Sequence, residues 1–396
     1  MKKSISIIGS GPSALFLAAF LDLEKYDVTI YEKNKTAGRK FLVAGKGGFN
    51  LTHSESLEKF TEKYTPTNFL KESITNFTNQ NFRDWLLKIG IPTYIGSSKR
   101  VYPKEGIKPI EVLNSILKYL KNKGVQLKFS HCFSAWDNGN NIIINDKQIK
   151  SDFTVFALGG ASWKVTGSDG NWLDVFQSKG IKTVPFEASN CAFKINWESE
   201  FLKKNEGKPL KNIEIYCDSK KQKGEVVITK FGLEGNGIYG LSPQIRNQLN
   251  ANHKAIIYID FKPIFDLEKV KFKIKNALSK NTTQILKKEL KLNSAVIDLL
   301  KNNLSKEDYL NSDVLSKKIK KFPLEIVATN SLDKAISSVG GICLTAINKH
   351  GELNVLKNQF CIGEMLNWDA PTGGYLIQGC VSNGVSLANY LNKLSS

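Results

Sequence analysis

Arginine is scarce in this sequence, the cysteines are scattered, and there is no long apolar run. Only four of the 56 basic residues are arginine, and the other 52 are lysine. The six cysteines include no Cys-x-x-Cys pair, which excludes the common zinc and dithiol spacings and provides no disulfide framework. The four histidines show no metal-ligand spacing either, so we expect no metal site. No stretch approaches the roughly 18 apolar residues that indicate a membrane span.

Composition and length indicate an ordinary globular protein with more than one domain. Hydrophobic residues make up 41% and charged residues 23%, which excludes disorder, collagen and coiled coil. A length of 396 residues, at roughly 150 residues per domain, predicts two to three domains. The chain passes from Met-Lys-Lys directly into the strand-like SISIIG, whereas a signal peptide needs a longer apolar stretch and a cleavage site. We therefore expect a cytoplasmic protein that acts away from membranes.

The net charge of +19 has two interpretations. A strongly basic chain is typical of proteins that bind nucleic acid or another polyanion. However, such proteins usually rely on arginine for bidentate contacts, and here lysine, asparagine and isoleucine are abundant together, as AT-rich codons would produce. We favour a compositional origin of the charge and keep a nucleic-acid partner as the alternative.

Sequence character changes twice along the chain. Residues 4–8, 28–32, 125–133 and 153–158 are expected to form strands, and residues 55–90 are expected to be mainly helical. Residues 190–262 contain short alternating strands, residues 266–320 are lysine-rich and helical, and glycine-rich, strand-like sequence returns from about residue 335. A helical module between two β regions indicates an insertion into a parent α/β domain.

The strongest local motif is Gly9-x-Gly11-x-x-Ala14, which follows a short apolar strand. Gly9 permits a tight turn, Gly11 lets the backbone approach a pyrophosphate, and Ala14 allows close helix–strand packing. Pro12 is a favoured first helical residue, so the phosphates would lie at a helix N-terminus. Glu32, at the end of the next strand, is placed to accept hydrogen bonds from a ribose diol. In this strand–turn–helix–strand context the motif predicts dinucleotide binding.

Three later glycine-rich segments favour FAD over NAD. Residues 45–48 lie in a basic loop soon after Glu32, which suits a long cofactor, although a flexible surface loop is the alternative. The strand after Asp152 ends in Ala-x-Gly-Gly at residues 157–160. Gly373-Gly374 precede a long apolar helix whose N-terminus would stabilise negative charge on a flavin ring.

Five segments together carry a resemblance to a known family: GSGPSALFLA, YEKNKTAGRKFLVAGKGGFNLTHSE, ALGGASWKVTGSDGNW, TKFGLEGNGIYGLS and FCIGEMLNWDAPTGGYLIQG. The chain resembles the BaiN- or YhiN-like NAD(P)/FAD-dependent oxidoreductases, also described as aminoacetone oxidase-like flavoproteins, in a subgroup with GKGGFNLTHSE. The resemblance implies a two-dinucleotide-binding-type, Rossmann-like FAD domain formed by residues 1–189 and 336–396. It also implies an insert at 190–335, with a β-barrel from 190–264 and about 320–335 and a helical module at 265–319.

The resemblance also implies which residues contact FAD. Gly9, Gly11 and Ala14 would hold the pyrophosphate, Glu32 the adenosine ribose, and the backbone of Phe133 the adenine. The remaining expected contacts are Pro12, Ser13, Lys33, Arg39, Lys40, Gly45, Gly47, Gly48, Asn50, Ala157, Gly159, Gly160, Gly363, Glu364, Gly373, Gly374 and Tyr375. Many family members have Cys where this chain has Phe49, so a flavin–thiol relay at this loop is not expected.

A second GxGxxG match, Gly235 to Gly240, is not expected to form a nicotinamide domain. No second strand with a terminal acid follows at the required distance, and Pro243 and polar residues come instead. If NAD(P)H is the transient reductant, we expect it to dock on the flavin without a Rossmann domain of its own.

Catalytic candidates are few: His53 as an acid or base, Arg100 as an anchor for an anionic group, and Tyr375 beside the glycine pair. For His53 a hydrogen bond that orders the loop is the simpler reading, and Arg100 is equally consistent with a surface residue. The flavin would carry the hydride chemistry. We therefore predict an FAD-dependent oxidoreductase that transfers hydride between NAD(P)H or a small organic substrate and FAD, with reduction of conjugated C=C bonds as one activity. The alternative is a flavoprotein that binds or modifies RNA or tRNA through its lysine-rich surface.

Overall fold

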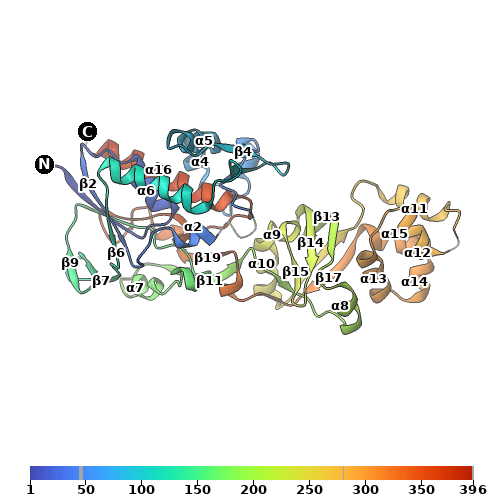
Figure 1. Cartoon of the computed structure of the whole chain (residues 1–396). Helices are drawn as coiled ribbons and strands as arrows, with labels where there is room; N and C mark the ends of the chain where they lie inside the picture. The colour runs from blue at the N-terminus through green and yellow to red at the C-terminus, as the bar shows by residue number, and fades with distance from the viewer. Residues whose placement is uncertain (44–47, 280, 395–396) are drawn as a thin grey trace. The chain divides into compact units, whose positions relative to one another are not determined.

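The computed structural model describes residues 1–43, 48–279 and 281–394. It divides into two compact units, one made of Met1–Ala188 with Leu332–Ser396 and the other of Ser189–Ser331. Both ends of the chain lie in the first unit (Figure 1). No helix among the described residues is long and apolar enough to cross a membrane.

The first unit is built on a parallel sheet. In its described part five strands lie in the order β20-β10-β1-β2-β6, and every neighbouring pair is parallel. The central strands are buried and apolar, as expected for a sheet covered on both faces. The predicted strands after Ser4, Val28 and Phe153 are all present. The strand bounds are β1 (Lys3–Ile8), β2 (Tyr26–Glu32), β6 (Gln126–Phe129), β10 (Phe153–Phe156) and β20 (Gln359–Cys361).

Two helices from opposite ends of the chain pack closely in this unit. Helix α1 (Pro12–Phe20) contacts α16 (Tyr375–Leu394) and also α6 (Pro109–Lys123). At Gly384 a Cβ atom would lie 2.3 Å from the carbonyl oxygen of Ser13, so only glycine lets the two backbones approach this closely. The C-terminal segment thereby joins the N-terminal βαβ unit in one core.

One predicted strand is wrong in its extent. Residues 125–133 were expected to form a single strand, but β6 ends at Phe129 and Ser130 has a positive φ of 56°. The Ser130 amide donates to the Asn34 carbonyl, and this turn directs the chain into a separate antiparallel sheet. That sheet contains β7 (Phe133–Trp136), β8 (Ile142–Ile144) and β9 (Lys147–Ile149).

Smaller elements complete the first unit. The segment predicted to be helical at 55–90 contains three helices, and a short antiparallel sheet is formed by one strand before it and two strands after it. The bounds are α2 (Arg39–Val43), α3 (Leu57–Thr61), α4 (Lys71–Asn76), α5 (Asn79–Lys88), α7 (Trp172–Ser178), β3 (Thr52–His53), β4 (Thr93–Ile95), β5 (Arg100–Pro103), β11 (Thr183–Ser189) and β19 (Ser337–Ile342).

The second unit has its own antiparallel sheet and core. Within residues 189–331, residue 280 aside, seven strands lie in the order β17-β16-β13-β14-β15-β12-β18. The two end strands, β17 and β18, come from one continuous stretch at 322–329. The strand bounds are β12 (Phe193–Lys194), β13 (Pro209–Cys217), β14 (Lys220–Ile228), β15 (Gly232–Glu234), β16 (Ala255–Asp260), β17 (Phe322–Ile326) and β18 (Ala328–Thr329).

The lysine-rich segment between β16 and β17 is helical, as predicted (Figure 1). Asp266, Asn281, Asn293, Ser305 and Asn311 each cap a helix there with a side-chain hydrogen bond. The helices of this unit are α8 (Ser199–Asn205), α9 (Asn236–Tyr239), α10 (Ser242–Asn252), α11 (Leu267–Lys275), α12 (Thr282–Lys288), α13 (Ser294–Asn303), α14 (Lys306–Leu310) and α15 (Ser312–Lys320).

The glycines of the second GxGxxG match serve packing. A Cβ atom at Gly235 would lie 2.8 Å from the carbonyl oxygen of Glu225, and one at Gly237 would lie 3.0 Å from the same oxygen. These glycines let α9 lie directly on β14. The expectation that no strand with a terminal acid follows is wrong, because β16 ends at Asp260. However, β16 and β14 are separated by β13, and both pair antiparallel with it, so they do not form the adjacent parallel pair of a dinucleotide-binding unit.

Candidate functional site

A cleft of about 340 Å³ opens at the carboxyl ends of β1, β2 and β10 in the first unit. In α/β sheets this edge is where ligands bind, because loops from successive strands meet there. The residues that follow each strand, Gly9, Lys33 and Ala157, all line the cleft. The chain after β6, including Phe133, lines it as well.

The turn between β1 and α1 forms one wall of the cleft. Gly9 has a φ of +101°, and a Cβ atom there would lie 2.4 Å from the carbonyl oxygen of Ala157. At Gly11, the N-cap of α1, a Cβ atom would meet nothing within 4 Å, so this position faces open space. Pro12 begins the helix, no side chain caps it, and its first turn carries no acidic residue. The free amides and the helix dipole favour a phosphate at this point.

The carboxylate of Glu32 is held in place at the end of β2. Its Oε2 accepts hydrogen bonds from the Ser10 amide at 3.2 Å and the Ser10 hydroxyl at 2.5 Å. Its Oε1 accepts from the Asn34 amide at 2.8 Å and from Asn34 Nδ2 at 2.7 Å. These bonds occupy the roughly four lone-pair directions of the carboxylate, so a ribose diol would have to replace some of them. Ser10 and Asn34 were not predicted, although both flank motif residues and line the cleft.

The basic residues of the cleft already have partners within the protein. Lys40 Nζ lies 2.9 Å from Glu364 Oε1 and donates to the Ser162 hydroxyl at 2.8 Å. Arg39 donates to the Asn34 side chain and to the Val165 carbonyl, both at 2.9 Å. The Lys40–Glu364 pair thus joins two cleft-lining segments from opposite ends of the chain.

The structure brings together about half of the predicted cofactor contacts in this cleft. The predicted residues that line it are Gly9, Gly11, Pro12, Ser13, Glu32, Lys33, Arg39, Lys40, Phe133, Ala157, Gly159 and Glu364. The predicted residues that do not line it are Ala14, Gly48, Asn50, Gly160, Gly363, Gly373, Gly374 and Tyr375. Gly45 and Gly47 lie outside the described residues.

Two of the glycines that do not line the cleft have a packing role. A Cβ atom at Gly160 would lie 2.1 Å from the Ser338 hydroxyl, and one at Gly363 would lie 2.2 Å from the Ser13 hydroxyl. Both positions therefore allow segments from distant parts of the chain to meet directly behind the cleft. The sequence motif alone does not separate a glycine that faces a ligand from one that faces another segment.

The three catalytic candidates lie together in the first unit. Strand β3 pairs with β5 so that His53 lies opposite Arg100. A Cβ atom at Gly374 would lie 2.5 Å from Thr52 Cα, which shows how closely the glycine pair approaches β3. A Cβ atom at Gly373 would lie 3.5 Å from Arg100 Nε and 3.4 Å from the Tyr375 ring.

A carboxylate that was not predicted completes this cluster. The Tyr375 hydroxyl donates to Glu55 Oε1 at 2.5 Å, and the His53 and Tyr375 rings stack with centroids 5.2 Å apart. Burial and then the Glu55 carboxylate raise the pKa of Tyr375 well above its ordinary value. Glu55 ends the NLTHSE segment, which is the one sequence signal that pointed to it.

The surroundings of His53 disfavour its charged form. Burial lowers its pKa below 6.5, and the nearby Glu55 opposes this only in part. The Glu55 amide donates to His53 Nδ1 at 3.2 Å, so in the neutral ring the proton resides on Nε2. The loop-ordering hydrogen bond expected for His53 is therefore present.

The β3-β5-β4 sheet carries aromatic side chains on the same face as Arg100. Along β5, Val101 is buried, whereas Arg100 and Tyr102 are half-buried and lie on the opposite face, as the strand alternation requires. Tyr94 of β4 lies opposite Tyr102, with ring centroids 5.6 Å apart. Among residues 1–43, 48–279 and 281–394, the Arg100 guanidinium makes no hydrogen bond or ion pair. A cation and aromatic rings therefore share one face beside Tyr375.

No cluster of three His, Cys, Asp or Glu side chains suited to a metal ion occurs among the residues that the structure describes.

The sheet order, the glycine turn and the uncapped helix define an α/β protein with a Rossmann-like FAD-binding fold. The model of the HI0933-like protein Rossmann domain matches residues 3–390, so the chain belongs to the HI0933-like family of flavin-dependent oxidoreductases.

Two curated relatives match over almost their whole length. The ribosomal RNA dihydrouridine synthase of Haemophilus influenzae is 24% identical, and the match covers 98% of each chain. The 3-dehydro-bile acid delta(4,6)-reductase of Clostridium scindens is 22% identical, with 96% of this chain and 97% of that protein covered.

Solved structures support the fold. The open conformation of a flavocytochrome c3 fumarate reductase matches with a TM-score of 0.51 at 14% identity, over 100% of this chain and 78% of that chain. The 3-ketosteroid-delta4-(5alpha)-dehydrogenase of Rhodococcus jostii RHA1, in complex with 4-androstene-3,17-dione, also matches with a TM-score of 0.51, at 13% identity. This match covers 98% of this chain and 97% of that chain. At these identities the likeness shows the fold alone.

Proposed function

We propose that this protein is an FAD-dependent reductase that saturates a C=C bond conjugated to a carbonyl group. The observation that carries the proposal is the Tyr375–Glu55–His53–Arg100 cluster at the start of α16, a helix whose Cys380 lines the dinucleotide cleft. The names of both curated relatives support it, because a bile acid delta(4,6)-reductase and a dihydrouridine synthase each name the saturation of such a bond.

The cleft residues fit the adenosine diphosphate part of FAD. The open space at Gly11 and the free amides of α1 suit the pyrophosphate. The Glu32 carboxylate would take the ribose diol in place of some of its bonds from Ser10 and Asn34. Phe133 and the half-buried His131 lie at the end of the cleft that follows β6. Bound FAD would supply the hydride, with NADH or NADPH as its source in this proposal.

The chain itself must supply a proton and hold the substrate carbonyl. Saturation of the bond adds a hydride to the carbon β to the carbonyl and a proton to the α carbon. Tyr375 Oη is the proton donor in this proposal, since its raised pKa keeps it protonated until the substrate carbon becomes basic. Its hydrogen, which points at Glu55 in this structure, must turn to that carbon, and solvent then returns a proton to the phenolate. Arg100, a cation without a protein partner among the described residues, would hold the carbonyl oxygen or an anionic group of the substrate.

An anaerobic two-step experiment tests this function. The protein loaded with FAD is first mixed with NADH or NADPH, and loss of the visible flavin absorbance reports hydride arrival. An enone bile acid or uridine-containing RNA is then added, and the absorbance should return as a product two mass units heavier forms. Oxygen should reoxidise the reduced protein, which serves as the control. If oxygen does so but no conjugated carbonyl compound restores the absorbance, the proposal is wrong.

A second candidate function keeps the same chemistry on an RNA substrate. It is favoured by the net charge of +19 and by the name of the Haemophilus influenzae relative. In this version the conjugated carbonyl belongs to a pyrimidine base within a folded RNA. Treating total RNA with the reduced protein and measuring dihydrouridine by mass spectrometry separates the two candidates.

We also propose that residues 190–335 are an insert in the FAD domain and that its sheet forms the expected barrel. Its two end strands are consecutive in sequence, and the Val327 amide donates to the Lys194 carbonyl between them, which supports closure. A cytoplasmic location is part of the same proposal. Limited proteolysis tests the insert, because cleavage near both boundaries should release it as a folded fragment.

A further inference from the structure

A short loop of the second unit presents an exposed aliphatic side chain beside unpaired lysines. It joins β16 to α11 and comprises residues 261–266. Ile264 is 72% exposed, although isoleucine is one of the residue types most often buried. Lys262 and Phe265 in the same loop are half-buried.

The side chain of Lys320 holds the backbone of this loop by hydrogen bonds. Its ammonium group donates to the carbonyl oxygen of Lys262 at 3.0 Å and to that of Phe265. It also forms an ion pair of 2.6 Å with Asp260, whose carboxylate accepts from the Lys262 amide at 2.8 Å. The side chains of Lys320 and Asp260 are largely buried, so this network holds the loop in one conformation.

Three lysines lie close together on this loop and next to it. The ammonium groups of Lys262 and Lys273 are 5.8 Å and 5.5 Å from the centre of the Phe265 ring. Burial lowers the pKa of Lys262, and the charges of Lys291 and Lys273 lower it further. None of the three forms an ion pair within the described parts of the chain.

Other lysines of α11, the helix that contains Lys273, do form ion pairs. Lys271 and Lys275 both pair with Asp313, at 2.7 Å and 3.2 Å. Asp266, the last residue of the loop, caps α11 by accepting from the Lys269 amide at 2.7 Å. A lysine excess of purely compositional origin gives no reason for two ammonium groups to gather at one aromatic ring, with the charge of a third lysine also acting on Lys262.

We propose that Lys262, Lys273 and Lys291, with Phe265 and Ile264, form an RNA-binding surface that contacts the phosphate backbone. A polyanion relieves the repulsion among the three ammonium groups, and the apolar side chains add contact with an unstacked base. This deepens the RNA candidate for the proposed function, because it names the surface that would hold the RNA. RNA binding by this surface does not require the reductase activity.

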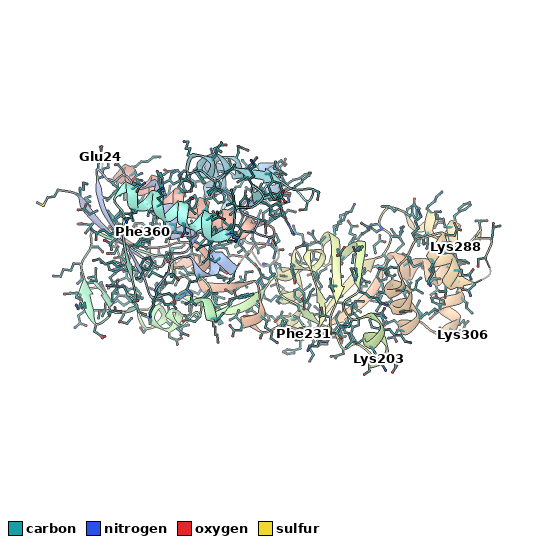
Figure 2. All side chains as sticks on the ribbon, in the orientation of Figure 1. Glu24, Lys203, Phe231, Lys288, Lys306 and Phe360 are labelled. Atoms are coloured by element: carbon teal, nitrogen blue, oxygen red, sulfur yellow. The ribbon has the colours of Figure 1, made fainter. Side chains whose placement is uncertain are left out.

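Binding of a fluorescent single-stranded RNA oligonucleotide, followed by anisotropy across a salt series, tests the surface. The triple variant Lys262→Gln, Lys273→Gln, Lys291→Gln should lose at least about tenfold in affinity, and its salt slope should fall by about 2. The matched control is Lys203→Gln, Lys288→Gln, Lys306→Gln, which removes the same charge from exposed positions of the same unit (Figure 2). The control should weaken binding less than threefold.

Three results overturn the proposal: no RNA binding by the wild-type chain, equal losses in both triple variants, or equal binding of polyglutamate with the same loss. The last would assign the surface to an acidic protein. The triple Lys→Arg variant at the same three positions should bind normally, and thermal melting of each variant checks that it is folded. Turnover of a small enone by wild-type protein is measured separately, so failure of the reductase and failure of the RNA surface remain distinguishable.

Discussion

The Tyr375 hydroxyl donates a hydrogen bond of 2.5 Å to the carboxylate of Glu55, which lies 320 positions earlier in the chain. The two residues meet because α16 begins at Tyr375, directly after a glycine pair that lies against β3. A phenol whose pKa is raised by burial and by a carboxylate keeps its proton through the neutral pH range. It is therefore able to deliver that proton to a substrate only when the substrate carbon becomes basic.

Replacing Tyr375 by Phe should slow substrate reduction by about 10²-fold or more, because the variant lacks the proton donor. Reduction of bound FAD by its hydride donor should keep its wild-type rate, since that step uses no proton from Tyr375. Stopped-flow absorbance resolves the two steps. Glu55→Gln, which retains an oxygen acceptor for the hydroxyl, serves as the control and should give a smaller loss. Wild-type substrate reduction by the Phe variant would remove Tyr375 from the proposed mechanism.

Gly9 and Gly11 should respond differently to substitution by alanine. At Gly9 the new methyl group would lie 2.4 Å from the Ala157 carbonyl oxygen in a backbone with φ +101°, so Gly9→Ala should lower the melting temperature. At Gly11 the methyl group would meet no protein atom, so Gly11→Ala should melt like wild-type protein without cofactor. It should nevertheless bind FAD at least about tenfold more weakly, because the methyl group would stand where the pyrophosphate approaches.

Thermal melting without cofactor and FAD fluorescence titration measure these two properties separately. If Gly11→Ala binds FAD as tightly as wild-type protein, the pyrophosphate does not lie at the N-terminus of α1. If Gly9→Ala melts normally, the close contact with Ala157 relaxes at little cost.

Much of the cleft followed from local sequence, whereas the second cluster did not. Gly9, Gly11 and Glu32 belong to one βαβ unit, in which spacing along the chain fixes position in space. Glu55 and Tyr375 are brought together by long-range packing, and no short-range pattern encodes that contact. Gly160 and Gly363 show the same limit, because their neighbours Ser338 and Ser13 come from distant segments.

The predicted strand at 125–133 failed for a local reason that propensity does not reveal. Residues 125–129 alternate apolar and polar side chains, as a strand does, but Ser130 adopts a positive φ and bonds to Asn34 of another loop. A tertiary hydrogen bond therefore ended the strand. The same turn brings His131 and Phe133 to the cleft.

Glu32→Gln should weaken FAD binding by about ten- to a hundredfold and leave the fold intact. The amide keeps one oxygen acceptor but loses the charge that strengthens hydrogen bonds from a ribose diol. It also turns one acceptor into a donor beside the Ser10 and Asn34 donors, so a modest loss of stability is expected. Fluorescence titration of FAD gives the affinity, and Ser10→Ala, which removes one donor to the carboxylate, is the matched comparison. An unchanged affinity in Glu32→Gln would place the ribose elsewhere.

The lowered pKa of His53 predicts how stability depends on pH. Well above pH 6.5 the ring is neutral in both the folded and the unfolded chain, so it contributes no pH dependence there. As the pH falls below 6.5, the unfolded chain takes up a proton more readily than the folded chain, and stability decreases until the folded pKa is passed. His53→Asn removes this proton uptake and keeps an acceptor for the Glu55 amide. Urea unfolding of both proteins between pH 7.5 and about 5 should therefore show a steeper decline for wild-type protein than for the variant. Parallel declines would mean that burial does not hold His53 neutral.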